Sequence, residues 1–112
     1  MTTSGTNSEP VALSISVELV EGRAAVNVYI AGEIDMSNVA VVSRAIDDAA
    51  AMAPHVRLDL AHVSFIDCSG VRTLLLAKNR LKELGGEFSI LALSHRVERL
   101  LELTGTSEEL TS

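Results

Sequence analysis

Residues 55–84 read HVRLDLAHVSFIDCSGVRTLLLAKNRLKEL and contain, in one run, a strand, a loop and a helix. The first six residues alternate between apolar and polar side chains from Val56 onward, which is the period expected of a β-strand buried on one face. Residues 61–67 form a short segment that we interpret as a loop. From Val71 the apolar residues recur at spacings of three and four, which predicts an amphipathic helix that stops at Gly85-Gly86. A strand followed by such a helix predicts a crossover connection.

Two further alternating segments precede this stretch. Residues 11–19 and 24–30 each alternate apolar and polar side chains, and the turn Glu21-Gly22-Arg23 separates them. We therefore expect a β-hairpin whose first strand is buried on one face. Ser37 then predicts the N-cap of a helix that ends at Pro54. Apolar residues of that helix recur at helical spacing: Val39, Val42, Ile46 and Ala49.

On the C-terminal side, the apolar run at residues 88–91 predicts a fourth strand. Ser94 predicts the N-cap of a last helix, which Gly105 closes. Strands separated by helices imply crossovers between parallel strands. The sequence therefore predicts an α/β fold with a mixed sheet of four or five strands and about three helices, in the order β-β-α-β-α-β-α.

The length of 112 residues allows one hydrophobic core and too little chain for a second. Residues 1–10 are polar and lack periodicity, so we expect a flexible N-terminal tail. We expect the folded domain to cover residues 11–105. Residues 106–112 are interpreted as a polar C-terminal tail.

Composition argues against several classes of function. The formal net charge is −6 and only three residues are aromatic, whereas nucleic-acid binders need a basic surface and usually stacking side chains. No run approaches the roughly 20 apolar residues that span a bilayer, and residues 1–10 lack the pattern of a signal peptide. Cys68 is the only cysteine, so no internal disulfide is possible. We therefore expect a cytoplasmic protein without nucleic-acid or membrane partners.

The polar residues do not form a recognisable catalytic or metal site. The chain has three histidines: His55, His62 and His95. Their spacings are not those of a metal site, and one cysteine cannot complete a set. Gly85-Gly86 follows a helix, whereas a nucleotide-binding glycine loop precedes one. Asp67 occupies the position where a nucleophile elbow centred on Ser69 would need glycine. We therefore expect no metal, no cofactor and no enzymatic activity.

The segment that differs from this background is Phe65–Val71, FIDCSGV, at the junction between a strand's loop and a helix. By itself it is a helix N-terminus that Asp67 or Ser69 caps. Its centre, Asp67-Cys68-Ser69-Gly70, resembles the Asp-Ser-Ser/Thr-Gly phosphorylation motif of STAS-domain anti-sigma-factor antagonists. In that family the second hydroxyl residue accepts the phosphate, and here this residue is Ser69.

Three other segments extend the resemblance to residues 11–105. Gly32–Asp35 is similar to the family's Gly-Glu-hydrophobic-Asp box, and Gly85–Glu87 is similar to its Gly-Gly before the fourth strand. Val97–Gly105 is similar to the family's third helix, which ends in Leu-Ser/Thr-Gly. Two features depart from the family: Cys68 stands where serine is usual, and no apolar strand follows Gly105.

The resemblance implies partner switching. The unphosphorylated domain binds an anti-sigma factor that is also a serine kinase and so releases a sigma factor, phosphorylation of Ser69 ends this binding, and a phosphatase restores it. The implied partner-binding residues are Asp35, Asp67, Cys68, Ser69 and Gly70. For Asp35, we consider a place beside Ser69 on the docking surface and a capping role for the helix near Ser37 equally good hypotheses.

Other functions remain open on the sequence. A STAS-like subunit of a signalling or lipid-transport assembly shares this fold and differs in never being phosphorylated at Ser69. Cys68 allows a redox sensor that pairs with a thiol on another molecule, although a small buried apolar residue is the simpler interpretation.

Overall fold

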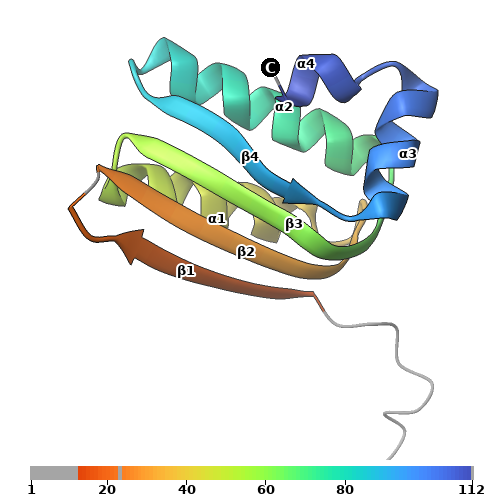
Figure 1. The fold of residues 1–112 in the computed structure, drawn as a ribbon, viewed down its shortest axis with the longest axis horizontal. Helices are drawn as coiled ribbons and strands as arrows, with labels where there is room; N and C mark the ends of the chain where they lie inside the picture. Colours follow the sequence, from red (N-terminus) through yellow and green to blue (C-terminus); the bar gives the residue numbers. More distant parts are fainter. Residues whose placement is uncertain (1–12, 23, 112) are drawn as a thin grey trace, which may run out of the picture.

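The computed structural model describes residues 13–22 and 24–111 as one mixed sheet with helices packed against it (Figure 1). Its elements in chain order are β1 (Ser14–Val20), β2 (Ala25–Ile34), α1 (Val39–Met52), β3 (His55–Ile66), α2 (Cys68–Glu83), β4 (Glu87–Leu93), α3 (His95–Thr104) and α4 (Ser107–Thr111). The predicted α/β order is therefore confirmed, with a fourth short helix added at the C-terminus. The predicted N-terminal tail lies outside the described residues.

The strands lie in the order β1-β2-β3-β4. β1 and β2 form the predicted antiparallel hairpin, and β2, β3 and β4 run parallel, as their helical crossovers require. Figure 1 shows α1 and α2 side by side on one face of the sheet, while the opposite face has no helix over it among the described residues. The parallel strands end on the same side of the sheet, which brings their following loops together.

The core between the sheet and the two helices is aliphatic. Residues of one face of β2 and β3 are fully buried there, together with residues from α1, α2 and α3; examples are Val26, Val28, Ile30, Leu58, Ile46, Leu74 and Leu101. Burial of each such side chain contributes about 1.5–3 kcal/mol. The two phenylalanines stay outside the fully buried set, so branched aliphatic packing determines the core.

The segment 61–67, which we expected to be a loop, belongs mostly to β3. The strand continues to Ile66 because the end of β2 supplies a pairing partner, with Gly32 opposite Val63 and Ile34 opposite Ile66. Register shifts interrupt this pairing. The buried residues of β3 are therefore spaced by two up to Leu60 and by three afterwards, at Val63 and Ile66. A β-bulge shifts the phase of the alternation, and that hid the strand in the sequence.

We expected residues 106–112 to be a polar C-terminal tail, but the part of this segment that the structure describes, residues 106–111, is folded. Residues Ser107–Thr111 form α4, which packs against α2, α3 and β4. Leu110 is 1% exposed and joins the main core, and the Lys78 Nζ donates a hydrogen bond of 2.6 Å to the Glu109 carbonyl. Leu110 is therefore the apolar residue through which this helical turn packs on the core.

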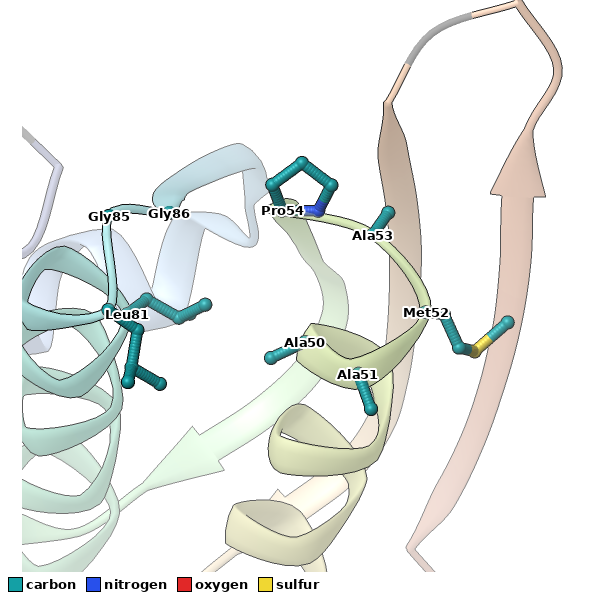
Figure 2. A pocket seen from close by; sticks show the side chains of 9 residues that line it. Ala50, Ala51, Met52, Ala53, Pro54, Leu81, Gly85 and Gly86 are labelled. Atoms are coloured by element: carbon teal, nitrogen blue, oxygen red, sulfur yellow. The ribbon is translucent and has the colours of Figure 1, made fainter.

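The glycine pair after α2 closes the end of the molecule opposite the loops that follow β2 and β3. Gly85 has a left-handed backbone with φ 82°, as expected at a helix C-terminus. A Cβ on Gly86 would lie 2.6 Å from the Pro54 carbonyl oxygen, which accepts a hydrogen bond from the Glu87 N–H. A hollow of about 320 Å³ lies between Gly85-Gly86 and the end of α1, and Figure 2 shows residues that line it. The predicted helix stop at Gly85-Gly86 is confirmed.

Candidate functional site

Asp67 connects the end of β3 to the start of α2. Its backbone is extended, and its carboxylate Oδ1 accepts a hydrogen bond of 2.9 Å from the Gly70 N–H, as an N-cap residue does. Of the two capping residues that the sequence offers, the structure therefore selects Asp67. Ser69 is left free of a capping role in the first turn of α2.

Ser69 is half-buried rather than fully exposed, and it is not among the buried residues of α2. Its hydroxyl donates a hydrogen bond of 2.6 Å to Asp67 Oδ1. The first-turn N–H groups of a helix have no partner within the helix, so a group attached to the Ser69 Oγ meets the positive end of the helix dipole. The serine is thus oriented by a carboxylate and placed where an added anion is tolerated.

Cys68 is exposed, which corrects the expectation of a buried apolar residue. Cys68 is the first residue of α2. In the same turn, Gly70 and Val71 are the residues that face the core and are buried. The position in the first turn determines the exposure, because residues of one turn point in different directions from the axis. Cys68 therefore forms part of the surface around Ser69.

Gly70 is buried, and its place in the motif has a packing reason. A Cβ at this position would lie 2.5 Å from Ile66 Cγ1 and 2.9 Å from Ile34 Cγ2, closer than such atoms approach in proteins. Only glycine lets the first turn of α2 rest on the ends of β2 and β3. A direct contact of Gly70 with a partner stays a prediction.

The loop after β2 is held by its own polar side chains. Asp35 Oδ1 accepts hydrogen bonds from the Ser37 N–H at 2.9 Å and the Ser37 hydroxyl at 2.5 Å. The Asn38 side chain donates to the Glu33 carbonyl and accepts from the Asp35 N–H. Asn38, not Ser37, is the N-cap residue of α1, without a side-chain capping bond. The Asp35 carboxylate therefore closes a turn before the helix, and its docking role stays a prediction.

Met36 is a residue that sequence reasoning missed. Its N–H donates a hydrogen bond of 3.2 Å to Asp67 Oδ2, so the loop after β2 lies directly beside the start of α2. The side chain of Met36 is 77% exposed. The sequence did contain a signal for this residue, because Met36 is an apolar residue between Asp35 and Ser37, which form a turn. An apolar side chain in such a turn is exposed to solvent and does not pack in the core.

The carboxylate of Asp67 is ionised more readily than an isolated aspartate. Partial burial alone raises the pKa of Asp67, but the hydrogen bonds from the Ser69 hydroxyl and from the N–H groups of Gly70, Met36 and Ser69 outweigh it. Together they hold the pKa of Asp67 below its ordinary value of 3.8. At neutral pH the site therefore carries a full negative charge beside the serine hydroxyl.

An apolar groove adjoins the motif on the side of α3. It has a volume of about 470 Å³ and lies between the end of β3, the first turns of α2 and the last turns of α3. Its lining residues are Phe65, Ile66, Asp67, Cys68, Val71, Arg72, Leu75, Leu100, Thr104 and Thr106. The groove extends the surface around Ser69. The motif at residues 67–70 did not predict that residues of α3 line this groove.

The described part of the chain holds no cluster of three or more histidine, cysteine, aspartate or glutamate residues that could bind a metal ion. None of the helices within residues 13–22 and 24–111 is long and apolar enough to cross a membrane.

Comparison with known proteins gives consistent matches. The sequence model of the STAS domain matches residues 16–111. The anti-sigma-B factor antagonist of Listeria monocytogenes is 32% identical over 98 residues, which cover 86% of this chain and 86% of the relative. The crystal structure of an anti-sigma factor antagonist from Mycobacterium paratuberculosis superposes with a TM-score of 0.74 at 26% identity, covering 88% of this chain and 82% of that one. The anti-sigma factor antagonist SpoIIAA in its unphosphorylated form gives a TM-score of 0.64 at 25% identity, covering 85% and 84%.

Proposed function

Because the chain belongs to the STAS-domain family, we propose that it is an anti-sigma-factor antagonist controlled by phosphorylation of Ser69. The unphosphorylated form binds an anti-sigma factor that is also a serine kinase, and so releases a sigma factor. Transfer of a phosphoryl group from ATP to the Ser69 Oγ ends this binding, and a phosphatase restores it in the cytoplasm. The observation that carries the proposal is the Ser69 hydroxyl, half-buried at the N-terminus of α2 and held by Asp67 at 2.6 Å.

The site tolerates a phosphate without unfolding. A phosphate on Ser69 lies at the positive end of the α2 dipole, which favours an anion by about 0.3–1 kcal/mol at exposed sites. The cap from Asp67 Oδ1 to the Gly70 N–H shares its acceptor with the Ser69 hydroxyl, but the backbone hydrogen bond from the Val71 N–H to the Asp67 carbonyl holds the same turn without that oxygen. The modified protein is therefore expected to keep its fold.

The same phosphate prevents docking. It adds roughly 1.5 to 2 negative charges next to the ionised Asp67, and a partner that buries the neutral hydroxyl would have to dehydrate that charge. Each 1.4 kcal/mol of lost binding free energy lowers affinity about tenfold. Phosphorylation is therefore expected to cost several kcal/mol of binding free energy, which is enough to end the complex.

The docking surface has a charged centre and apolar surroundings. Met36, whose N–H bonds to Asp67, and Cys68, which precedes Ser69, are both exposed, and the lining of the apolar groove includes Phe65, Asp67 and Cys68. Protein interfaces typically combine an apolar contact with a few polar groups that fix the orientation. We assign Asp35 to the rim of this surface, because its loop is tied to Asp67 through Met36.

The test uses the purified anti-sigma factor kinase of the same organism. Incubation with kinase and ATP should add one phosphoryl group on Ser69, as mass spectrometry of the intact protein and its peptides detects, and Ser69→Ala should gain none. Ser69→Asp should lose the kinase in a binding assay and keep the circular dichroism spectrum of the wild type, whereas Ser69→Ala should bind. Phosphate on another residue, or full binding by the phosphorylated protein, contradicts the proposal and favours a STAS subunit that is never phosphorylated.

A further inference from the structure

The two edges of the sheet differ. β4 forms one edge, where a register shift opposite Leu58 and Asp59 leaves Leu91 unpaired and α4 packs close by. β1 forms the other edge, and its pairing with β2 is continuous from Ser14 to Val20 without a bulge. A bulge blunts an edge, whereas a regular strand presents a row of unpaired N–H and carbonyl groups that can pair with another strand. Within the described residues, the outer N–H and carbonyl groups of β1 pair with no other strand, and a second strand is the partner that matches their regular spacing.

The helix-facing side of this edge is apolar and exposed, contrary to the expectation of a strand fully buried on one face. Val17 is 42% exposed and Leu19 is 57% exposed, although their partners on β2, Val28 and Val26, are fully buried. Two α1 residues on the flank away from α2 continue the apolar surface: Val41 and Met52, 56% and 52% exposed. Figure 2 shows the Met52 side chain pointing away from Leu81 and the α2 side. We call these four residues the edge patch.

We propose that two copies of the chain associate through β1, antiparallel and centred on Val17, to form a continuous eight-stranded sheet. This register pairs Ser14 with Val20, Ile15 with Leu19 and Ser16 with Glu18 of the other copy, so apolar residues meet on the helix side. Glu18 faces a serine, and it is held on the open face of the sheet by the Tyr29 hydroxyl at 2.8 Å. A register centred on Glu18 instead places two carboxylates opposite each other, which destabilises a strand pair.

The helices above the sheet are compatible with this arrangement. A two-fold axis through Val17 makes the two α1 helices antiparallel and covers the edge patch of both copies. Arg44 and Asp48 are both exposed and lie one turn apart on α1, so this helix carries charges of both signs on its exposed surface. The net charge of −6 on each chain opposes association over longer distances, and salt screens that repulsion. The test of association therefore uses a buffer of at least about 0.15 M ionic strength, in which this repulsion is screened.

Sedimentation equilibrium over a range of protein concentrations tests the association. The wild type should approach twice the 11.9 kDa of one chain, and Val17→Lys should raise the dimer dissociation constant at least tenfold. Leu103→Lys is the matched control, because Leu103 is 78% exposed on α3 away from the edge patch. Leu19→Lys provides a second edge variant, and circular dichroism checks that each variant is folded. A wild type that stays monomeric at every concentration, or a dimer that Val17→Lys and Leu19→Lys leave intact, overturns the proposal.

Cysteine cross-linking tests the register. With Cys68→Ser as background, Val17→Cys should form a disulfide-linked dimer on mild oxidation, since directly opposed residues have Cα atoms about 4.5–5.5 Å apart. Leu19→Cys should not, because four residues of register separate the two Leu19 positions by roughly 13 Å. Efficient linkage of Leu19→Cys without linkage of Val17→Cys rejects the proposed pairing. A different outcome would also reject the proposed dimer: the wild type stays monomeric at every concentration, and Val17→Lys loses kinase binding. The edge strand β1 would then bind a different protein.

Discussion

At the scale of single residues, Asp67 does more than cap a helix. Its Oδ1 accepts from the Ser69 hydroxyl and the Gly70 N–H, and its Oδ2 accepts from the Met36 N–H. One carboxylate therefore joins the loop after β2, the start of α2 and the candidate phosphoacceptor. Phosphorylation replaces the hydroxyl proton that Asp67 accepts, so the first local effect falls on the Asp67–Ser69 hydrogen bond.

The hydrogen bonds to Asp67 predict a pH dependence of stability. Because the pKa of Asp67 is lower in the folded state than its ordinary value of 3.8, the native protein gains stability from the ionised carboxylate above that value. This contribution is lost as the pH falls through the lower folded-state pKa. Asp67→Asn should therefore be less stable than the wild type at pH 7, and the difference should shrink toward pH 3. Urea unfolding of both proteins between pH 3 and 7 measures it; a difference constant with pH contradicts the assignment.

Gly70 gives a prediction about packing. Gly70→Ala puts a methyl group 2.5 Å from Ile66 Cγ1, so α2 must shift away from the ends of β2 and β3. Overpacking of this kind destabilises by about 1–3 kcal/mol. Ser69→Ala, one position earlier in the same turn, is the control and should change stability by less than about 1 kcal/mol. Equal stabilities of the two variants in urea unfolding would show that the contact relaxes freely.

At the scale of elements, parallel strands determine where the switch lies. β2 and β3 run in the same direction, so the loops that follow them meet at one edge of the sheet and bring Met36 to Asp67. α3 lies beside the second half of β3, where β4 has ended, and the Ser94 hydroxyl fastens it to the Val63 carbonyl at 2.6 Å. Beside the second half of β3, α3 therefore occupies the position that β4 has beside the first half, and the apolar groove lies between α3, α2 and the end of β3.

The short helix α4 is expected to be part of the folded domain energetically as well as structurally. Leu110→Ala removes a side chain that is 1% exposed, and buried leucines lose about 2–5 kcal/mol on such truncation. Leu103→Ala, at a position 78% exposed, should stay within about 0.5 kcal/mol of the wild type. Thermal or urea unfolding of the pair decides between a docked helix and a dispensable tail, since a tail would make both changes neutral.

At the scale of the whole molecule, the switch and the edge patch occupy different sides. Val17 pairs with Val28, which is six residues of β2 before Ile34 and the loop that reaches Asp67. At about 3.3 Å per residue, roughly 20 Å of strand separates them. Ser69→Asp should therefore dimerise with the same dissociation constant as the wild type while losing the kinase. A changed sedimentation equilibrium in Ser69→Asp would instead show that the two surfaces are coupled.

Local patterns predicted most of the architecture because each element carries its own signal. The alternation of residues 24–30, the helical spacing after Val71 and the stop at Gly85-Gly86 depend on the chain's nearest neighbours, and all three are confirmed. The resemblance of the segment at Asp67–Gly70 identified the STAS family, which the comparison over residues 16–111 confirmed. Its assignment of Ser69 as the phosphoacceptor remains the proposal to be tested.

Contacts between distant segments decided the rest. Bulges in the pairing with β2 changed the phase of β3, and the packing of α4 against α2, α3 and β4 buried Leu110. The hydrogen bond from the Met36 N–H to Asp67 brought Met36 to the site. The exposure of Val17 and Leu19 likewise depends on how far α1 extends over the edge of the sheet. Periodicity reports which residues share a face of one element, whereas burial depends on what another element places over that face, and only the tertiary structure contains that information.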